Sequence, residues 1–84
     1  MLIVDVWNRI LKNEGETFRQ IRGKTFTYTV VANSLKLSTT NRSISKKTIE
    51  QALEFLPLEN TTPLQNLQAP SYLYAILTDK RITS

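Results

Sequence analysis

Residues 26–39 have the sequence FTYTVVANSLKLST, and this stretch decides the fold. Apolar and polar side chains alternate strictly over the first five residues, which is typical of a strand with one buried face. If Ala32 and Asn33 form a two-residue turn, a second strand returns in a register that sorts almost every side chain by polarity. Asn33 tolerates a positive φ and would allow this turn. The opposed pairs are Val30 with Leu35, Tyr28 with Leu37 and Phe26 with Thr39 on the apolar face, and Thr29 with Lys36 and Thr27 with Ser38 on the polar face.

A further turn at residues 23–24 would add a strand before this hairpin. It places Ile21 opposite Phe26 on the apolar face. The same register puts two side chains on unexpected faces, because Arg19 falls among the apolar residues and Phe18 among the polar ones. We interpret Arg19 as a flaw in this register or as a snorkelling side chain at the sheet edge.

Three helices are expected around the sheet. The first covers residues 4–13 and stops near Gly15, where a left-handed conformation is favourable. The second begins at the N-cap Ser45 and ends at Pro57, and the third covers residues 71–78. The apolar side chains that share a helical face are Trp7, Ile10 and Leu11 in the first helix, Ile49, Ala52, Leu53 and Leu56 in the second, and Leu73, Ile76 and Leu77 in the third.

These elements predict a single α+β domain over residues 1–84, in the order α-β-β-β-α-α. A small three-stranded antiparallel sheet is packed on one face by helices. A chain of 84 residues is long enough for one core and short for a second domain. The aromatic side chains expected in this core are Trp7, Phe26, Tyr28 and Phe55.

The composition excludes several kinds of chemistry. The chain has no cysteine and no histidine, so it has no disulfide scaffold, no thiolate zinc site and no histidine general base. Its two glycines cannot form a glycine-rich phosphate loop. The acid pairs Glu14 with Glu16 and Glu50 with Glu54 lack a third ligand for a hard cation. We therefore expect a non-enzyme with no cofactor and no metal.

Positive charge is concentrated in one part of the chain. Residues 17–49 contain no Asp or Glu and hold seven of the eleven basic residues, so the stretch carries +7 and the rest of the chain −3. A block of one sign in a folded domain suggests an anionic partner. The seven basic residues are Arg19, Arg22, Lys24, Lys36, Arg42, Lys46 and Lys47.

The polar sheet face is the first candidate site. Basic side chains there would neutralise phosphates, while hydroxyl and amide groups can bond to phosphates or base edges. Some DNA-binding modules insert a small sheet into a groove. A solvated face rich in threonine is the alternative, since one wet face is usual for antiparallel sheets. The expected members are Gln20, Arg22, Thr25, Thr27, Thr29, Lys36 and Ser38.

The start of the helix at Ser45 is the second candidate site. A helix N-terminus carries partial positive charge and unpaired N–H groups, and Lys46 and Lys47 lie there with Arg42 just before them. This set would suit a phosphate or carboxylate. The alternative is that these lysines are surface residues, with Lys46 facing Glu50 one turn later.

Three aromatic residues have two interpretations. Phe18 would either stack on a nucleic-acid base or be covered by the C-terminal segment. Tyr72 and Tyr74 would either form a homodimer surface or belong to the core, with one ring packed inside and the other at the core edge.

Three segments together resemble a family of small, uncharacterised bacterial proteins of similar length. The segments are RGKTFTY at residues 22–28, TNRSIS at residues 40–45 and PSYLYAILTDKRI at residues 70–82. The likeness spans most of the chain. The family has no assigned activity or binding residues, so the resemblance implies no function.

We therefore expect a non-catalytic accessory module that binds nucleic acid, with DNA favoured. The alternative is a protein–protein interaction module, a homodimer through Tyr72 and Tyr74. No apolar run approaches the ~20 residues of a membrane span, and the apolar start is too short for a signal-peptide core, so a cytoplasmic location is expected. The expected phosphate contacts are Arg22, Lys24, Lys36, Arg42, Lys46 and Lys47.

Overall fold

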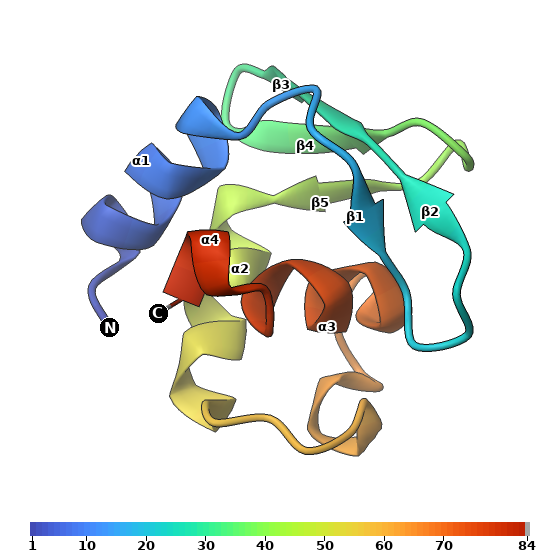
Figure 1. Cartoon of the computed structure of the whole chain (residues 1–84). Coiled ribbons are helices and arrows are strands. Elements are labelled where there is room, and N and C mark those ends of the chain that lie inside the picture. The colour runs from blue at the N-terminus through green and yellow to red at the C-terminus, as the bar shows by residue number, and fades with distance from the viewer. Residues whose placement is uncertain (84) are drawn as a thin grey trace.

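A computed structural model describes residues 1–83 and confirms the α+β class (Figure 1). Its helices are α1 (Ile3–Lys12), α2 (Lys46–Ala52), α3 (Pro70–Leu77) and α4 (Lys80–Thr83), with 3₁₀ turns η1 (Leu53–Phe55) and η2 (Thr62–Leu64). Its strands are β1 (Phe18–Arg19), β2 (Thr25–Phe26), β3 (Tyr28–Val31), β4 (Ser34–Leu37) and β5 (Ser43–Ser45). The strands form two antiparallel sheets, one of β1-β2 and one of β3-β4-β5.

The register predicted for the central hairpin is confirmed. Tyr28 lies opposite Leu37, and Val30 opposite Leu35. The two-residue turn is present, but Ala32 rather than Asn33 holds the positive φ, of 54°. β5 adds a third strand on the far side of β4, with its middle residue buried. The inner face of this sheet supplies Tyr28, Leu35, Leu37 and Ile44 to the core.

The register predicted for the first strand is wrong. Phe18, not Ile21, lies opposite Phe26, because residues 20–24 form a longer turn than expected. In that turn, the N–H of Gln20 donates to the carbonyl of Lys24 at 2.8 Å. A shift of three residues is odd, so it exchanges the two faces of the strand. Phe18 is consequently 1% exposed and Ile21 67% exposed.

Thr27 interrupts the strands between the two sheets. Its N–H donates to the Ser38 hydroxyl at 2.9 Å, and its carbonyl accepts from the Ser38 N–H at 3.0 Å. These two residues therefore meet as the register predicted, although no regular ladder joins them. Phe26, just before the break, packs its ring edge-on against Tyr72, with ring centroids 4.9 Å apart.

The helices bury most of their predicted faces, but two residues expected in the core, Leu11 and Phe55, are exposed. Leu11 is 44% exposed, because the buried face of α1 is centred on Val6, Trp7 and Ile10. Phe55 is 45% exposed, because α2 ends at Ala52 and the 3₁₀ turn that follows changes the direction in which side chains project. The stop after α1 is as expected, with Gly15 at φ +85°.

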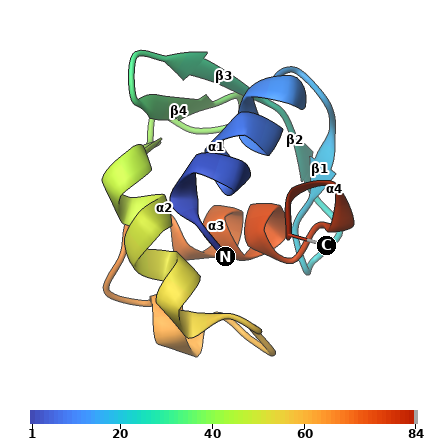
Figure 2. The same ribbon diagram turned by 90° about the vertical axis from the view of Figure 1, so that its left-hand side faces the viewer.

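The helix α4 was not predicted. Arg81 joins it to β1, since its guanidinium lies 4.1 Å from the centre of the Phe18 ring and donates to the Thr17 carbonyl at 2.8 Å. Arg81 also forms an ion pair with Asp79 at 2.8 Å. Figures 1 and 2 show the resulting arrangement, with α1 on the side of the molecule opposite the turns at residues 20–24 and 38–42.

Candidate nucleic-acid interface

The basic side chains of residues 17–49 have no acidic partners. None of them forms an ion pair with another of the described residues, 1–83. The ion pair found within those residues joins Arg81 to Asp79. Six of the seven are exposed: Arg19, Arg22, Lys24, Lys36, Arg42 and Lys47. None of these charges is therefore neutralised by a direct ion pair within the described residues.

Two of these cations, Arg22 and Lys24, line one polar hollow of about 640 Å³. They come from the turn between β1 and β2, and the facing wall comes from Thr61 and from Ser71 in the first turn of α3. The N-cap of α3, Ala69, has no side-chain oxygen to cap the first turn. Few backbone donors are free there, because Pro70 has no N–H and the Tyr72 N–H donates to the Ala69 carbonyl at 3.0 Å, so α3 adds mainly the partial positive charge of its helix dipole to the hollow.

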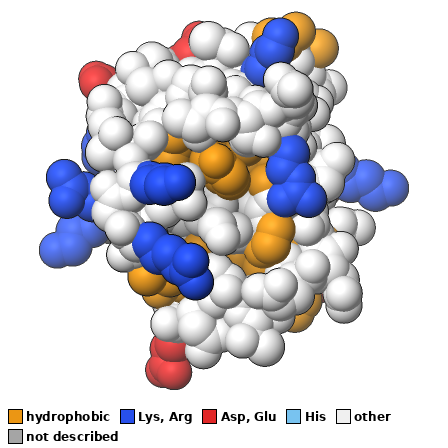
Figure 3. Space-filling view, turned by 90° about the vertical axis from the view of Figure 1, so that its right-hand side faces the viewer, with side chains coloured by type: hydrophobic (Ala, Val, Ile, Leu, Met, Phe, Trp, Pro, Cys, Tyr) orange, Lys and Arg blue, Asp and Glu red, His pale blue; other side chains and the backbone are white. Residues whose placement is uncertain are grey.

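The turn that carries Arg42 is joined to the start of α3 by a hydrogen bond. Tyr72, next to Ser71 in α3, has its hydroxyl 2.9 Å from the Thr39 hydroxyl in that turn. The Thr40 hydroxyl accepts from the Arg42 N–H at 3.3 Å within the same turn. Figure 3 shows this side of the molecule, on which Lys and Arg side chains surround a hollowed apolar area and acidic side chains lie toward the rim. The predicted contacts Arg22 and Lys24 therefore line the polar hollow, and Arg42 lies in a turn that a hydrogen bond joins to α3 beside it.

Lys36 lies on the outer face of the three-stranded sheet. Its neighbours across the strands are Thr29 and Ser43, and all three are exposed. Thr29 and Lys36 agree with the predicted polar sheet face, but Gln20 and Arg22, which were predicted on the same face, lie in the turn at residues 20–24 instead. Because Ser43 is adjacent to Arg42 in the chain, the row leads toward the same turn.

Lys46 and Lys47 lie at the opposite end of β5 from Arg42. The Lys46 ammonium is 5.5 Å from the centre of the Trp7 ring, in a cation–π contact. Both lysines line a hollow of about 680 Å³ that Glu50 also lines. These two lysines therefore do not line the polar hollow that Arg22 and Lys24 line, which is called the basic hollow below.

The unpaired donors expected at the start of α2 are largely occupied. The Lys46 N–H donates to the Asn33 carbonyl at 2.7 Å, and the Thr48 N–H donates to the Ser45 hydroxyl at 3.1 Å, which confirms Ser45 as the N-cap. Gln68, which sequence reasoning missed, accepts from the Ser45 N–H at 3.0 Å and from the Thr48 hydroxyl at 2.8 Å. This helix start is held by the protein itself and offers little to an anion.

Both C-terminal tyrosines contact the protein interior. Tyr72 packs on Phe26, and the Tyr74 hydroxyl donates to the Glu59 carbonyl at 3.2 Å. Each is half-buried against the core. These contacts agree with the alternative in which one ring packs inside and the other covers the core edge. Phe18 is likewise covered, under Arg81, rather than available to stack on a base.

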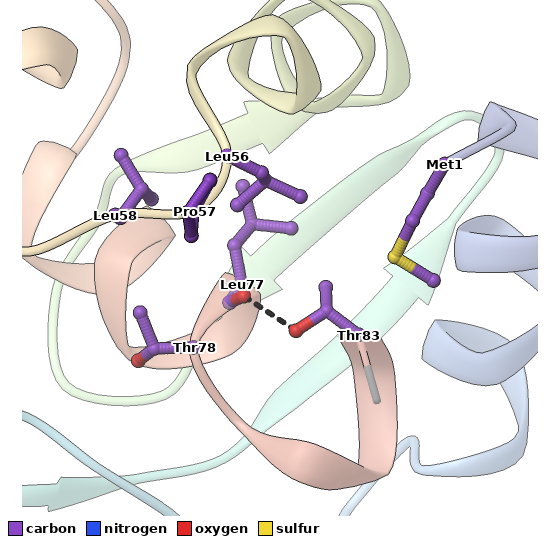
Figure 4. Close-up of a pocket in the computed structure, with 7 residues that line it drawn as sticks. All are labelled: Met1, Leu56, Pro57, Leu58, Leu77, Thr78 and Thr83. Atoms are coloured by element: carbon purple, nitrogen blue, oxygen red, sulfur yellow. Dashed lines mark hydrogen bonds between the residues drawn. The ribbon is translucent and has the colours of Figure 1, made fainter.

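A third hollow, of about 410 Å³, is mainly apolar (Figure 4). Met1, Leu56, Pro57, Leu58 and Leu77 line it together with two threonines. Both threonine hydroxyls already donate to carbonyls, Thr78 to Tyr74 at 2.6 Å and Thr83 to Leu77 at 2.7 Å. The lining side chains of this hollow include no acid and no base.

Acidic side chains are dispersed rather than clustered. Within residues 1–83, no three Asp or Glu side chains are placed to share a metal ion. None of the helices in the described part of the chain is long and apolar enough to cross a membrane. No protein-family model, curated protein or solved structure matches the chain.

Proposed function

We propose that this protein is a non-catalytic module that binds nucleic acid through the phosphate backbone. The observation that carries the proposal is the basic surface formed by unpaired Arg22 and Lys24, which line a hollow beside the first turn of α3, and by Arg42 in the turn that Thr39 joins to Tyr72 of α3. Lys36 extends this surface along the sheet. Lys46 and Lys47 are left out of the proposed contacts because of their place at the other end of β5 and the nearby Glu50.

Phosphate binding of this kind has a measurable signature. Each phosphate that is neutralised releases counterions. The logarithm of the affinity for duplex DNA therefore falls linearly with the logarithm of the salt concentration, and the slope is proportional to the number of phosphate contacts. Four contacts predict a loss of roughly 100-fold between ~50 and ~200 mM salt. Thr39, Thr61 and Ser71 supply hydroxyl groups around the surface, which can bond to phosphates but carry little base specificity.

The test is an amide NMR titration of the whole chain with a mixed-sequence DNA duplex and a single strand, at ~50 and ~200 mM salt. We expect shifts at residues 20–24, 38–43 and 71–72 that weaken strongly at the higher salt. The absence of shifts with both DNAs at the lower salt contradicts the proposal for DNA.

Two variants with the same change in net charge locate the surface. Arg22→Gln/Lys24→Gln removes the cations of the basic hollow, and Lys46→Gln/Lys47→Gln removes those at the start of α2. We expect the first to reduce affinity by at least tenfold and to lower the salt slope by about two contacts, and the second to change affinity by less than about threefold. Equal losses in the two variants would show that net charge alone drives binding.

A further inference from the structure

The outer face of α1 is exposed along its whole length, and nothing in residues 1–83 covers it (Figure 2). At about 100° per residue, Val4 and Leu11 lie along one edge of this face, and Asp5 and Lys12 lie along the other, with Asn8 between them. Val4 is 55% exposed and Leu11 44% exposed. The face therefore has an apolar edge and a charged edge that run side by side.

The charged edge is unpaired within the molecule. Neither Asp5 nor Lys12 forms an ion pair with another residue of the described chain. The two are seven residues apart, as are Val4 and Leu11, so each pair spans two helical turns or about 10 Å. Asp5 lies near one end of the helix and Lys12 at the other, with opposite charges.

A two-fold axis makes this face complementary to itself in one orientation only. If two α1 helices pack face to face with antiparallel axes, the rotation brings each edge against the same edge of the second copy. Asp5 then meets Lys12 of the second copy at both ends, and Val4 meets Leu11 of the second copy along the other edge. In the parallel arrangement each apolar edge would meet the charged edge, which leaves the charges unpaired and buries polar groups against apolar ones.

We propose that α1 is a homodimer interface, in which two copies of this chain pack their α1 helices antiparallel about a two-fold axis. Such isologous contacts are the commonest form of association between identical chains. The contact is small, because it is limited to one ten-residue helix from each copy. Interfaces of this size are typically weak and transient. This proposal is independent of the nucleic-acid proposal, since the basic surface lies on the opposite side of the molecule.

The test is sedimentation equilibrium at protein concentrations up to about 1 mM, a range that detects weak association. We expect the wild-type chain to dimerise reversibly. Asp5→Lys and Lys12→Asp should each weaken the dimer by at least tenfold, because each places like charges opposite one another. An equimolar mixture of the two variants should associate again, since one presents only lysines and the other only aspartates.

Restored association in the mixture is the decisive result, because it requires that residues 5 and 12 face each other in antiparallel copies. A wild-type chain that stays monomeric at about 1 mM overturns the proposal, and so does a mixture no more associated than its components. Leu11→Ser should weaken the dimer, whereas Val31→Ser should not, although Val31 on the outer sheet face is 59% exposed. Circular dichroism of each variant confirms that it remains folded.

Discussion

The hydroxyl of Tyr28 donates a 2.6 Å hydrogen bond to the carbonyl oxygen of Ile10, and both groups are buried. This bond joins the first residue of β3 to the last turns of α1 across 18 positions of sequence. Burial raises the pKa of the Tyr28 phenol well above its usual value. Nearby Arg81 opposes this increase, and the carboxylates of Glu14 and Asp79 add to it.

Replacing this tyrosine tests how much the bond stabilises the fold. Tyr28→Phe keeps the ring and removes only the donor, so we expect a loss of about 1–2 kcal/mol in the free energy of unfolding. Urea denaturation monitored by Trp7 fluorescence measures the change. An unchanged midpoint would show that the Ile10 carbonyl, which also accepts from the Asn13 N–H at 3.2 Å, is satisfied without Tyr28.

The raised pKa of Tyr28 also predicts how stability depends on alkaline pH. Because the folded state favours the neutral phenol, the unfolded chain loses this proton at lower pH than the folded chain does. The stabilisation is complete below the ordinary phenol pKa of about 10 and is lost progressively above it. We expect the unfolding temperature of the wild type to fall above this pH more steeply than that of Tyr28→Phe.

The observed register of β1 predicts opposite consequences for two neighbouring apolar residues. Phe18→Ala removes a buried ring that contacts Phe26 and Tyr28, and we expect a loss of about 3–5 kcal/mol. Ile21→Ser changes an exposed side chain, so its effect should lie within about 0.5 kcal/mol. Thermal unfolding of both variants decides between the registers, since the register with Ile21 opposite Phe26 would reverse the order.

In the turn between β3 and β4, Ala32 has a left-handed backbone conformation that glycine adopts more readily than alanine. Ala32 is exposed and holds φ at 54°, where a side chain is unfavourable and glycine is not. We expect Ala32→Gly to stabilise the protein by up to about 1 kcal/mol, because relief of roughly 1–2 kcal/mol of left-handed strain exceeds the roughly 0.5–1 kcal/mol lost to the greater flexibility of the unfolded glycine. Ala69→Gly is the matched control: its φ is 45°, but its methyl group is buried, so the gain should be smaller or absent.

The ion pair of α4 predicts a loss of stability in acid. The hydrogen bond from the Arg81 side chain lowers the pKa of Asp79, while partial burial opposes that shift. The contribution of this ion pair to stability is therefore present above the ordinary carboxyl pKa of about 4. It is lost as pH falls through the lower pKa that Asp79 has in the folded state. Because both side chains are partly exposed, we expect only about 0.2–1 kcal/mol. Asp79→Asn should cause this loss at neutral pH and show a shallower decline in acid, as followed by urea denaturation.

The parts of the fold that could be predicted from sequence are those that local patterns determine. The central hairpin follows from strict alternation, because one register alone places Tyr28 and Val30 opposite apolar partners. The pairing register of the first strand could not be predicted, since a two-residue turn and a longer turn both fit residues 20–24. The unexpected faces of Arg19 and Phe18 in the shorter turn were the only local sign that this register was wrong.

The candidate site required the tertiary structure. Its charge was evident from residues 17–49, but sequence could not show that β5 separates Arg42 from Lys46. It also could not show that Ser71 faces Arg22 and Lys24, because the turn and the helix lie about 50 residues apart in the chain. Gln68 was missed for the same reason: its partners Ser45 and Thr48 are more than one element away, and no periodicity joins them.

The positions of α1 and the basic surface on opposite sides of the molecule have a consequence for architecture. In a dimer joined through α1, the two basic hollows would face away from each other. The thickness of both molecules, each measuring 29 × 24 × 22 Å, would separate them. Such a pair is poorly placed to grip adjacent half-sites on one duplex. If the proposed function holds, the dimer would instead cross-link two separate strands or two distant stretches of one strand. It would compact nucleic acid rather than recognise a particular base sequence.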